Sequence, residues 1–168
     1  MGNHRVVWID NAKAIGIFLV VLGHLKLPHW LTYDIYAFHM PLFFFLSGYT
    51  FQPRGNPHAP AFLFKKARAL LAPYFIFSFL TYLFWLVIGR KFGADAGEPI
   101  SPLHPFIGIF YSVGVDDWMT HNVPMWFLTC LFVTESAFYF LARRAETPVL
   151  IAIAALCAVA GFVLAGCT

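Results

Sequence analysis

Apolar residues fill most of the chain, and charged or proline-rich stretches interrupt them at only a few places. A helix that crosses a bilayer needs about 20 mostly apolar residues. Five stretches approach this length, and they cover residues 14–27, 35–51, 69–89, 122–142 and 147–168. The pattern therefore predicts an all-α fold, a polytopic transmembrane helix bundle with about five spanning helices.

The first of these stretches is short, and residues 6–9 extend it backwards. Basic residues before a short apolar run also suit a signal peptide, which is the alternative interpretation. Asp10 and Lys13 stand where the apolar region of a signal peptide would begin, and no small-residue cleavage site follows. These features favour a first helix that is retained.

Residues 99–115 carry no charge before Asp116 but are broken by Pro99, Pro102 and Pro105. Because proline disrupts a helix interior, only about residues 106–113 are expected to be regular, which is too short to cross a membrane. We expect an outer interfacial or re-entrant segment here.

Composition supports a membrane protein and excludes other classes. Hydrophobic residues make up 60% of the chain and charged residues only 11%, whereas soluble domains carry about 25% charged residues. The formal charge is +3 with scattered basic residues, so no nucleic-acid partner is expected. The cysteines lack C-x-x-C spacing, so neither a disulfide framework nor a metal site is expected.

The basic residues orient the chain, because short cytoplasmic loops carry an excess of Lys and Arg. With a cytoplasmic amino terminus, three basic residues fall outside: Lys26, Arg90 and Lys91. The other eight fall inside: Arg5, Lys13, Arg54, Lys65, Lys66, Arg68, Arg143 and Arg144. We expect a multi-pass protein of the inner (cytoplasmic) cell membrane, with residues 54–68 as a cytoplasmic loop.

Ionisable residues within spanning segments mark functional sites. Lys13 and His24 are 11 positions apart, which places them on one helix face about 16 Å apart. Asp10 precedes Lys13 by three positions and joins that face. The alternative is an interfacial Asp10–Lys13 ion pair, with His24 reaching the outer headgroups. His39 adds a second intramembrane imidazole in the next span.

Several sequence motifs resemble those of a known protein family. Residues 8–24, from W-I-D-N-A-K to L-G-H, resemble the opening of the membrane-bound acyltransferase family 3 proteins, which have a basic residue and a histidine at this spacing. F-H-M-P-L-F-F-F-L-S-G at residues 38–48 is similar to the second-helix signature of the sugar O-acetylase, fucose 4-O-acetylase-like branch. K-K-A-R-A-L-L-A-P-Y at residues 65–74 and M-W-F-L at residues 125–128 resemble later segments.

The sequence also differs from the family pattern in two respects. Lys13 stands where many relatives have arginine, which replaces bidentate anion recognition by a point charge. Relatives typically have more spanning helices than this chain. We therefore expect residues 1–168 to be a single integral membrane domain that is the amino-terminal part of a longer acyltransferase domain.

The resemblance implies transfer of an acyl group, usually acetyl from acetyl-CoA, to a hydroxyl of a carbohydrate or lipid-linked glycan. Acetyl-CoA is then a donor substrate, no cofactor stays bound, and the partners are donor, acceptor and lipid bilayer, with a homo-oligomer left open. His24 is the candidate general base, since a neutral imidazole can remove a hydroxyl proton. Asp10 is the second catalytic candidate.

Binding residues follow from the chemistry of the substrates. Lys65, Lys66 and Arg68, with Lys13 deeper, suit the negative charges of coenzyme A, unless the first three only enforce topology. His39 is a candidate for binding substrate or polarising the thioester, or is a hydrogen-bonded core histidine. Glu135 is a candidate for orienting a histidine or binding sugar hydroxyls, and Trp126 for stacking on a sugar or joining an interfacial aromatic belt.

Two other functions stay open on the sequence alone. Histidines on adjacent membrane helices suit a haem bundle, and a buried array of charges suits a transporter. The basic triplet and the spacing of Lys13 and His24 favour acyl transfer, because a haem bundle needs neither. The remaining histidines are expected to be surface residues: His4, His29, His58, His104 and His121.

Overall fold

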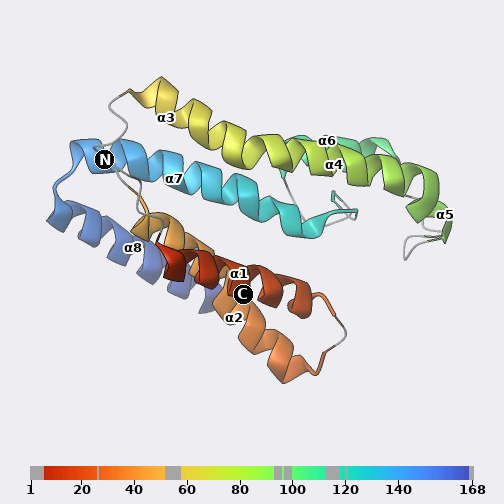
Figure 1. Cartoon of the computed structure of the whole chain (residues 1–168), viewed down its shortest axis with the longest axis horizontal. Helices are drawn as coiled ribbons and strands as arrows, with labels where there is room; N and C mark the ends of the chain where they lie inside the picture. Colours follow the sequence, from red (N-terminus) through yellow and green to blue (C-terminus); the bar gives the residue numbers. More distant parts are fainter. Residues whose placement is uncertain are drawn as a thin grey trace. The chain divides into compact units, whose positions relative to one another are not determined.

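The computed structural model describes residues 6–25, 27–51, 58–92, 96, 100–112, 118–119 and 121–166. Within these residues all regular structure is helical and falls into six continuous segments (Figure 1). The all-α prediction is confirmed. The chain forms two compact units, residues 1–52 and residues 53–168.

The first unit is a hairpin of α1 (Val7–Gly23) and α2 (His29–Tyr49). The buried residues of α1 are Ile9, Gly16 and Gly23, and their seven-residue spacing keeps them near one face of the helix. Small residues on such a face let two helices approach closely. The hairpin therefore owes its close packing to the two glycines.

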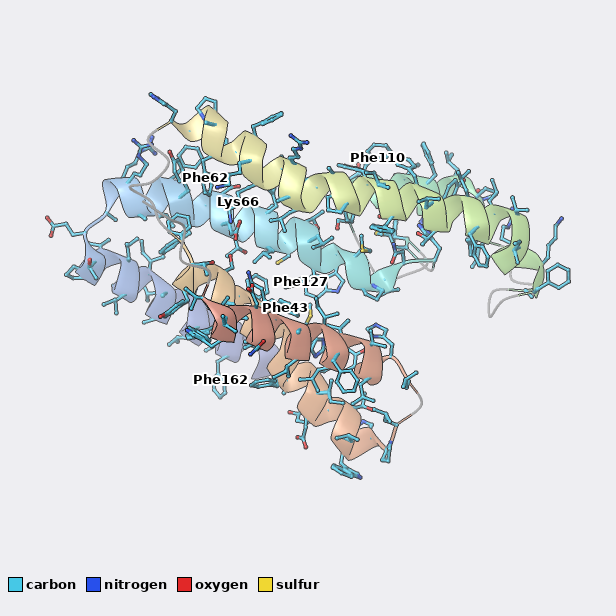
Figure 2. The ribbon with its side chains drawn as sticks, viewed as in Figure 1. Phe43, Phe62, Lys66, Phe110, Phe127 and Phe162 are labelled. Carbon is cyan, nitrogen blue, oxygen red and sulfur yellow. The ribbon has the colours of Figure 1, made fainter. Side chains whose placement is uncertain are left out.

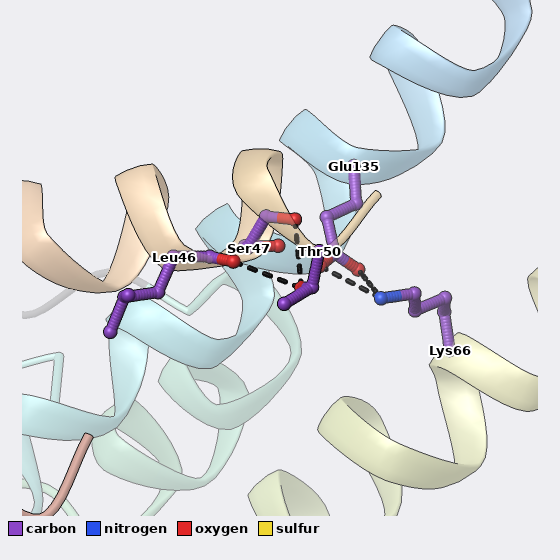
Figure 3. A network of polar contacts seen from close by, with 5 residues as sticks. All are labelled: Leu46, Ser47, Thr50, Lys66 and Glu135. Atoms are coloured by element: carbon purple, nitrogen blue, oxygen red, sulfur yellow. Dashed lines mark hydrogen bonds and ion pairs between the residues drawn. The ribbon is translucent and has the colours of Figure 1, made fainter. Parts of the chain in front are cut away.

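Contacts along the hairpin show that α2 runs antiparallel to α1. A Cβ built on Gly16 would lie 2.9 Å from the Phe43 ring, and one on Gly23 would lie 3.1 Å from Ile35. Near the start of α1, the ring centroids of Trp8 and Tyr49 are 5.1 Å apart. Thr50 closes α2 by donating its hydroxyl to the Leu46 carbonyl at 2.9 Å (Figure 3).

The second unit begins with one long helix over Ala59–Phe92, 34 residues in all. It consists of α3 (Ala59–Lys66), the π-helical segment η2 (Ala67–Leu71), α4 (Ala72–Phe84), the π-helical segment η3 (Trp85–Gly89) and α5 (Arg90–Phe92). The prediction that residues 54–68 form a loop is wrong for residues 59–68, which are helical, and its residues 54–57 lie outside the described residues. Lys and Arg are good helix formers, so the helix continues through Lys65, Lys66 and Arg68.

The π-helical segment η2 immediately precedes the turn that contains Pro73. A proline inside a helix lacks a donor and its ring obstructs the carbonyl four residues earlier. Bonding over five residues in η2 accommodates this interruption without ending the helix. The long helix thus passes its proline unbroken.

The short helix α6 (Leu103–Tyr111) lies antiparallel beside α4. Ring centroids are 5.7 Å apart for Tyr82 and Phe106, and 6.2 Å apart for Phe75 and Phe110. It begins three residues before the expected residue 106, because proline is tolerated in a first turn. Its neighbours on α4 lie in the middle of the charge-free stretch 69–89, which favours the re-entrant alternative over the interfacial one.

The chain then forms the 3-10 turn η4 (Val123–Met125), α7 (Trp126–Arg144) and α8 (Thr147–Gly166). Two helices among the described residues are long and apolar enough to cross a membrane, Ala59–Phe92 and Val123–Arg144. Residues Thr147–Val163 form a shorter apolar helix. The number of five spanning helices stays a prediction.

Candidate functional site

His24 follows the last residue of α1 and is exposed. Its Nδ1 atom lies 2.7 Å from the carbonyl oxygen of Val20. A carbonyl only accepts, so this hydrogen bond requires that Nδ1 carries the proton. In the neutral ring the lone pair is then on Nε2, which is the protonation pattern that a general base needs.

His39 is held in the same way on α2. Its Nδ1 lies 2.5 Å from the Ile35 carbonyl, one helical turn earlier. The side chain is 1% exposed and shares a buried face with Ile35 and Leu46. This geometry is that of the hydrogen-bonded core histidine, one of the two interpretations of His39 from the sequence, and it buries His39 whereas His24 is exposed.

The ring of Tyr36 joins the two histidines. Its centroid is 6.0 Å from that of His24 and 5.1 Å from that of His39, the latter in an edge-on arrangement. The structure therefore brings the two predicted histidines into one cluster, which we call the imidazole cluster: His24, Tyr36 and His39. Sequence reasoning missed Tyr36, although its position three residues before His39 predicts a shared helix face.

Lys13 and Asp10 lie toward the other end of α1. Because α1 is one unbroken helix, Lys13 is about 16 Å and Asp10 about 21 Å from His24 along the axis. The two catalytic candidates, Asp10 and His24, therefore do not meet. Lys13 is exposed and Asp10 is partly buried, and any role of Asp10 belongs to the Lys13 end of the helix.

In the second unit, Glu135 forms an ion pair with Lys66. The Lys66 Nζ atom lies 2.9 Å from Oε1 and 2.8 Å from Oε2 of Glu135 (Figure 3). The side chains are 28% and 8% exposed, respectively. Glu135, which was a candidate for orienting a histidine or binding a sugar, thus pairs with Lys66. Lys66 is one of the three basic residues that the sequence suggested for coenzyme A.

Aromatic contacts surround this ion pair. Phe62 of α3 stacks on Tyr139 of α7 with centroids 4.2 Å apart, and Figure 2 shows Phe62 and Lys66 pointing from α3 toward α7. The Arg143 guanidinium donates to the Tyr139 hydroxyl. These residues recur every four positions on their helices, so they form one continuous seam between α3 and α7.

The ion pair also fixes the depth of the basic triplet relative to α7. Glu135 is nine residues before Arg144, the end of α7, so Lys66 lies level with a point about 13 Å inside that end. Lys65 and Arg68 are exposed on the same part of the long helix. Within the basic triplet, Lys65 and Arg68 are therefore more available to a ligand than Lys66.

Three further predictions concern aromatic surroundings. Trp126 is the first residue of α7 and is exposed, which suits both of its interpretations. The prediction that His104 and His121 are surface residues is wrong, because both side chains are partly buried. The ring centroids of His104 and Trp118 are 4.0 Å apart, and those of His121 and Tyr82 are 5.7 Å apart. His29 and His58 are exposed, and His4 lies outside the described residues.

Together these features define an all-helical, membrane-associated protein with an imidazole cluster at the end of its first helix. The family model of the acyltransferase domain of family 3 matches residues 6–168. The chain belongs to this acyltransferase family, and the match runs through both compact units. No curated protein and no solved structure shows a significant match to the chain.

Proposed function

We propose that this protein transfers an acetyl group from acetyl-CoA to a hydroxyl of a carbohydrate or lipid-linked glycan, as in the sugar O-acetylase branch. Membership of the acyltransferase family supports the reaction class. The observation that carries the proposal is His24, an exposed imidazole whose Nδ1–H donates to the Val20 carbonyl. This bond leaves Nε2 as the basic atom.

In the proposed reaction, Nε2 of His24 removes the proton of the acceptor hydroxyl as its oxygen attacks the thioester carbonyl carbon. The carbon–sulfur bond then breaks, and the imidazolium returns the proton to the departing sulfur. An ester and free coenzyme A are the products. His39 is buried and contacts Tyr36, and it is proposed to support the substrate site from within the hairpin.

The donor requires positive charge for its phosphates. Lys65 and Arg68 are exposed on the long helix, and Lys13 is exposed on α1. Lys65 and Arg68 are proposed to attract the phosphates of coenzyme A to the long helix. Lys13 is proposed as a donor-binding cation of α1, from which a pantetheine arm could cover the distance of about 16 Å to His24. Trp126 is proposed to stack on the acceptor sugar. Glu135, through its pair with Lys66, is proposed to keep the seam between α3 and α7 in place for substrate binding.

The proposal places the protein in the inner membrane with a cytoplasmic amino terminus, because acetyl-CoA is made in the cytoplasm. The donor then enters from the inner side, and the acceptor meets His24 toward the outer leaflet. Asp10 is proposed to act near the donor end of α1, beside Lys13. Self-association remains compatible with this arrangement.

Labelled acetyl-CoA tests the proposal. Membranes that contain the complete protein and glycan acceptor are expected to form a labelled ester, whereas membranes without the protein are not. Lys65→Gln and Arg68→Gln are expected to raise KM for acetyl-CoA more than KM for the acceptor. Absence of ester formation, or a haem absorption band in the purified protein, would contradict the proposal; equal losses for both substrates would contradict the donor site.

A further inference from the structure

We propose that Tyr36 is a positioning residue, whose aromatic ring holds the His24 imidazole so that Nε2 faces the acceptor hydroxyl. This inference rests on the proposed role of His24 as general base. It assigns a function to a residue that neither the reaction chemistry nor the family match singles out. The ring and not the hydroxyl of Tyr36 carries the role.

The need for such a residue follows from where His24 stands. It lies just past the last turn of α1 and is exposed, so neighbouring side chains of its own helix cover it little. The bond from Nδ1 to Val20 sets both side-chain torsions of His24 while it is formed, but at an exposed position water competes for it. A second contact that keeps the ring in place therefore keeps Nε2 in one direction.

Tyr36 supplies this second contact from the neighbouring helix. Its ring centroid lies 6.0 Å from the imidazole of His24, within the range of favourable aromatic contacts. The centroid of the same ring lies 5.1 Å from that of His39, in an edge-on arrangement. His39 is itself fixed by its bond to Ile35 and is 1% exposed, so it provides a rigid base for Tyr36.

Gly23 makes the contact sterically feasible. A Cβ on Gly23 would lie 3.3 Å from Cε2 and 3.8 Å from Cδ2 of Tyr36, so the tyrosine ring lies directly against the end of α1. Gly23 is the residue immediately before His24. The absence of a side chain at this position therefore brings the Tyr36 ring next to the imidazole.

The test compares variants of Tyr36 in the complete protein. Tyr36→Leu is expected to lower kcat about 100-fold, the scale of a misplaced catalytic group, and to leave KM for both substrates unchanged. Tyr36→Phe is expected to restore most of the activity, because it keeps the ring. Tyr33→Leu is the matched control, since Tyr33 is 69% exposed one turn earlier on α2.

A second readout does not depend on acyl transfer. Diethyl pyrocarbonate modifies unprotonated imidazole nitrogens, and mass spectrometry gives the rate for each histidine. Tyr36→Leu is expected to increase the rate at His24, as is Gly23→Ala, which displaces the ring. Tyr33→Leu and Gly48→Ala are expected to leave it unchanged, because a Cβ at Gly48 would meet nothing within 4 Å.

Each result has a distinct meaning. An unchanged modification rate in Tyr36→Leu would overturn the positioning role, and so would equal losses of kcat in the Phe and Leu variants. A raised KM with unchanged kcat would assign Tyr36 to substrate binding instead. A changed rate at His24 in a protein that transfers no acyl group would support the geometry and refute the proposed function.

Discussion

At the scale of single residues, His24 and His39 are held by the same type of hydrogen bond. Each donates Nδ1–H to the carbonyl four residues earlier in its own chain. This local bond fixes the tautomer without any partner from another helix, which suits an apolar environment where polar groups need internal partners. The two rings differ in exposure, so only His24 is available to a substrate.

The Lys66–Glu135 ion pair gives a prediction at the same scale. Removing Glu135 leaves the partly buried Lys66 ammonium, which is 28% exposed, without this carboxylate partner. Glu135→Leu is expected to lower the free energy of unfolding by about 3 kcal/mol, and the double variant Lys66→Met with Glu135→Leu is expected to lose less than this single variant. Denaturant unfolding in detergent, followed by tryptophan fluorescence, measures both.

The matched control for this prediction is Lys65→Met, because Lys65 is exposed on the adjacent position of the same helix. This variant is expected to leave the free energy of unfolding nearly unchanged. A double variant that loses as much as Glu135→Leu and Lys66→Met measured singly and added together would show that Lys66 and Glu135 do not stabilise each other.

The sequence predicts some of the contacts between these residues and not others. The spacing of Lys13 and His24 needs only a regular helix, so their shared face was predictable and α1 is unbroken as required. The pairing of Lys66 with Glu135 joins residues 69 positions apart. No local pattern specifies which lysine of the basic triplet meets that acid, because the choice depends on how α3 and α7 pack.

At the scale of elements, the close approach of α6 to residue 118 depends on Gly108. A Cβ on Gly108 would lie 1.8 Å from the backbone oxygen of Trp118. Backbone cannot move aside as a flexible side chain can, so Gly108→Ala is expected to cost about 3 kcal/mol of unfolding free energy. The same denaturant unfolding measures it.

Gly161→Ala is the control for this variant, since nothing lies within 4 Å of a Cβ there. Alanine is the better helix former, so the control is expected to be neutral or slightly stabilising. Equal stability of the two variants would contradict the packing of α6 against residue 118.

Element boundaries were harder to predict than element types. The spans 35–51, 122–142 and 147–168 correspond to α2, α7 and α8. The charge-free stretch predicts a start at residue 69, whereas the long helix begins at Ala59, because lysine and arginine favour helices and do not end them. Its π-helical segments were not predictable from hydropathy, which carries no information on which carbonyl each amide contacts.

At the scale of the whole molecule, the distribution of basic residues predicts a topology. Single cysteines are introduced after replacement of Cys130, Cys157 and Cys167. A membrane-impermeant maleimide applied to intact cells is expected to label Ala96→Cys and not His58→Cys or Glu146→Cys. Permeabilised cells are expected to give label at all three exposed positions.

This experiment also tests the short helix α6. If α6 is re-entrant, the chain crosses only once, along α7, between residues 96 and 146, which places them on opposite sides. Labelling of both positions in intact cells would show that α6 crosses the membrane. Labelling of His58→Cys and Glu146→Cys, without labelling of Ala96→Cys, would show the reverse orientation.

The central claim is that His24 is the general base of an acyl transfer. The most direct measurement is ester formation from labelled acetyl-CoA by His24→Ala, compared with His29→Ala, whose exposed imidazole begins α2 outside the imidazole cluster. The account predicts a loss of about 100-fold or more for His24→Ala at an unchanged amount of protein in the membrane, and full activity for His29→Ala. Undiminished transfer by His24→Ala would contradict it.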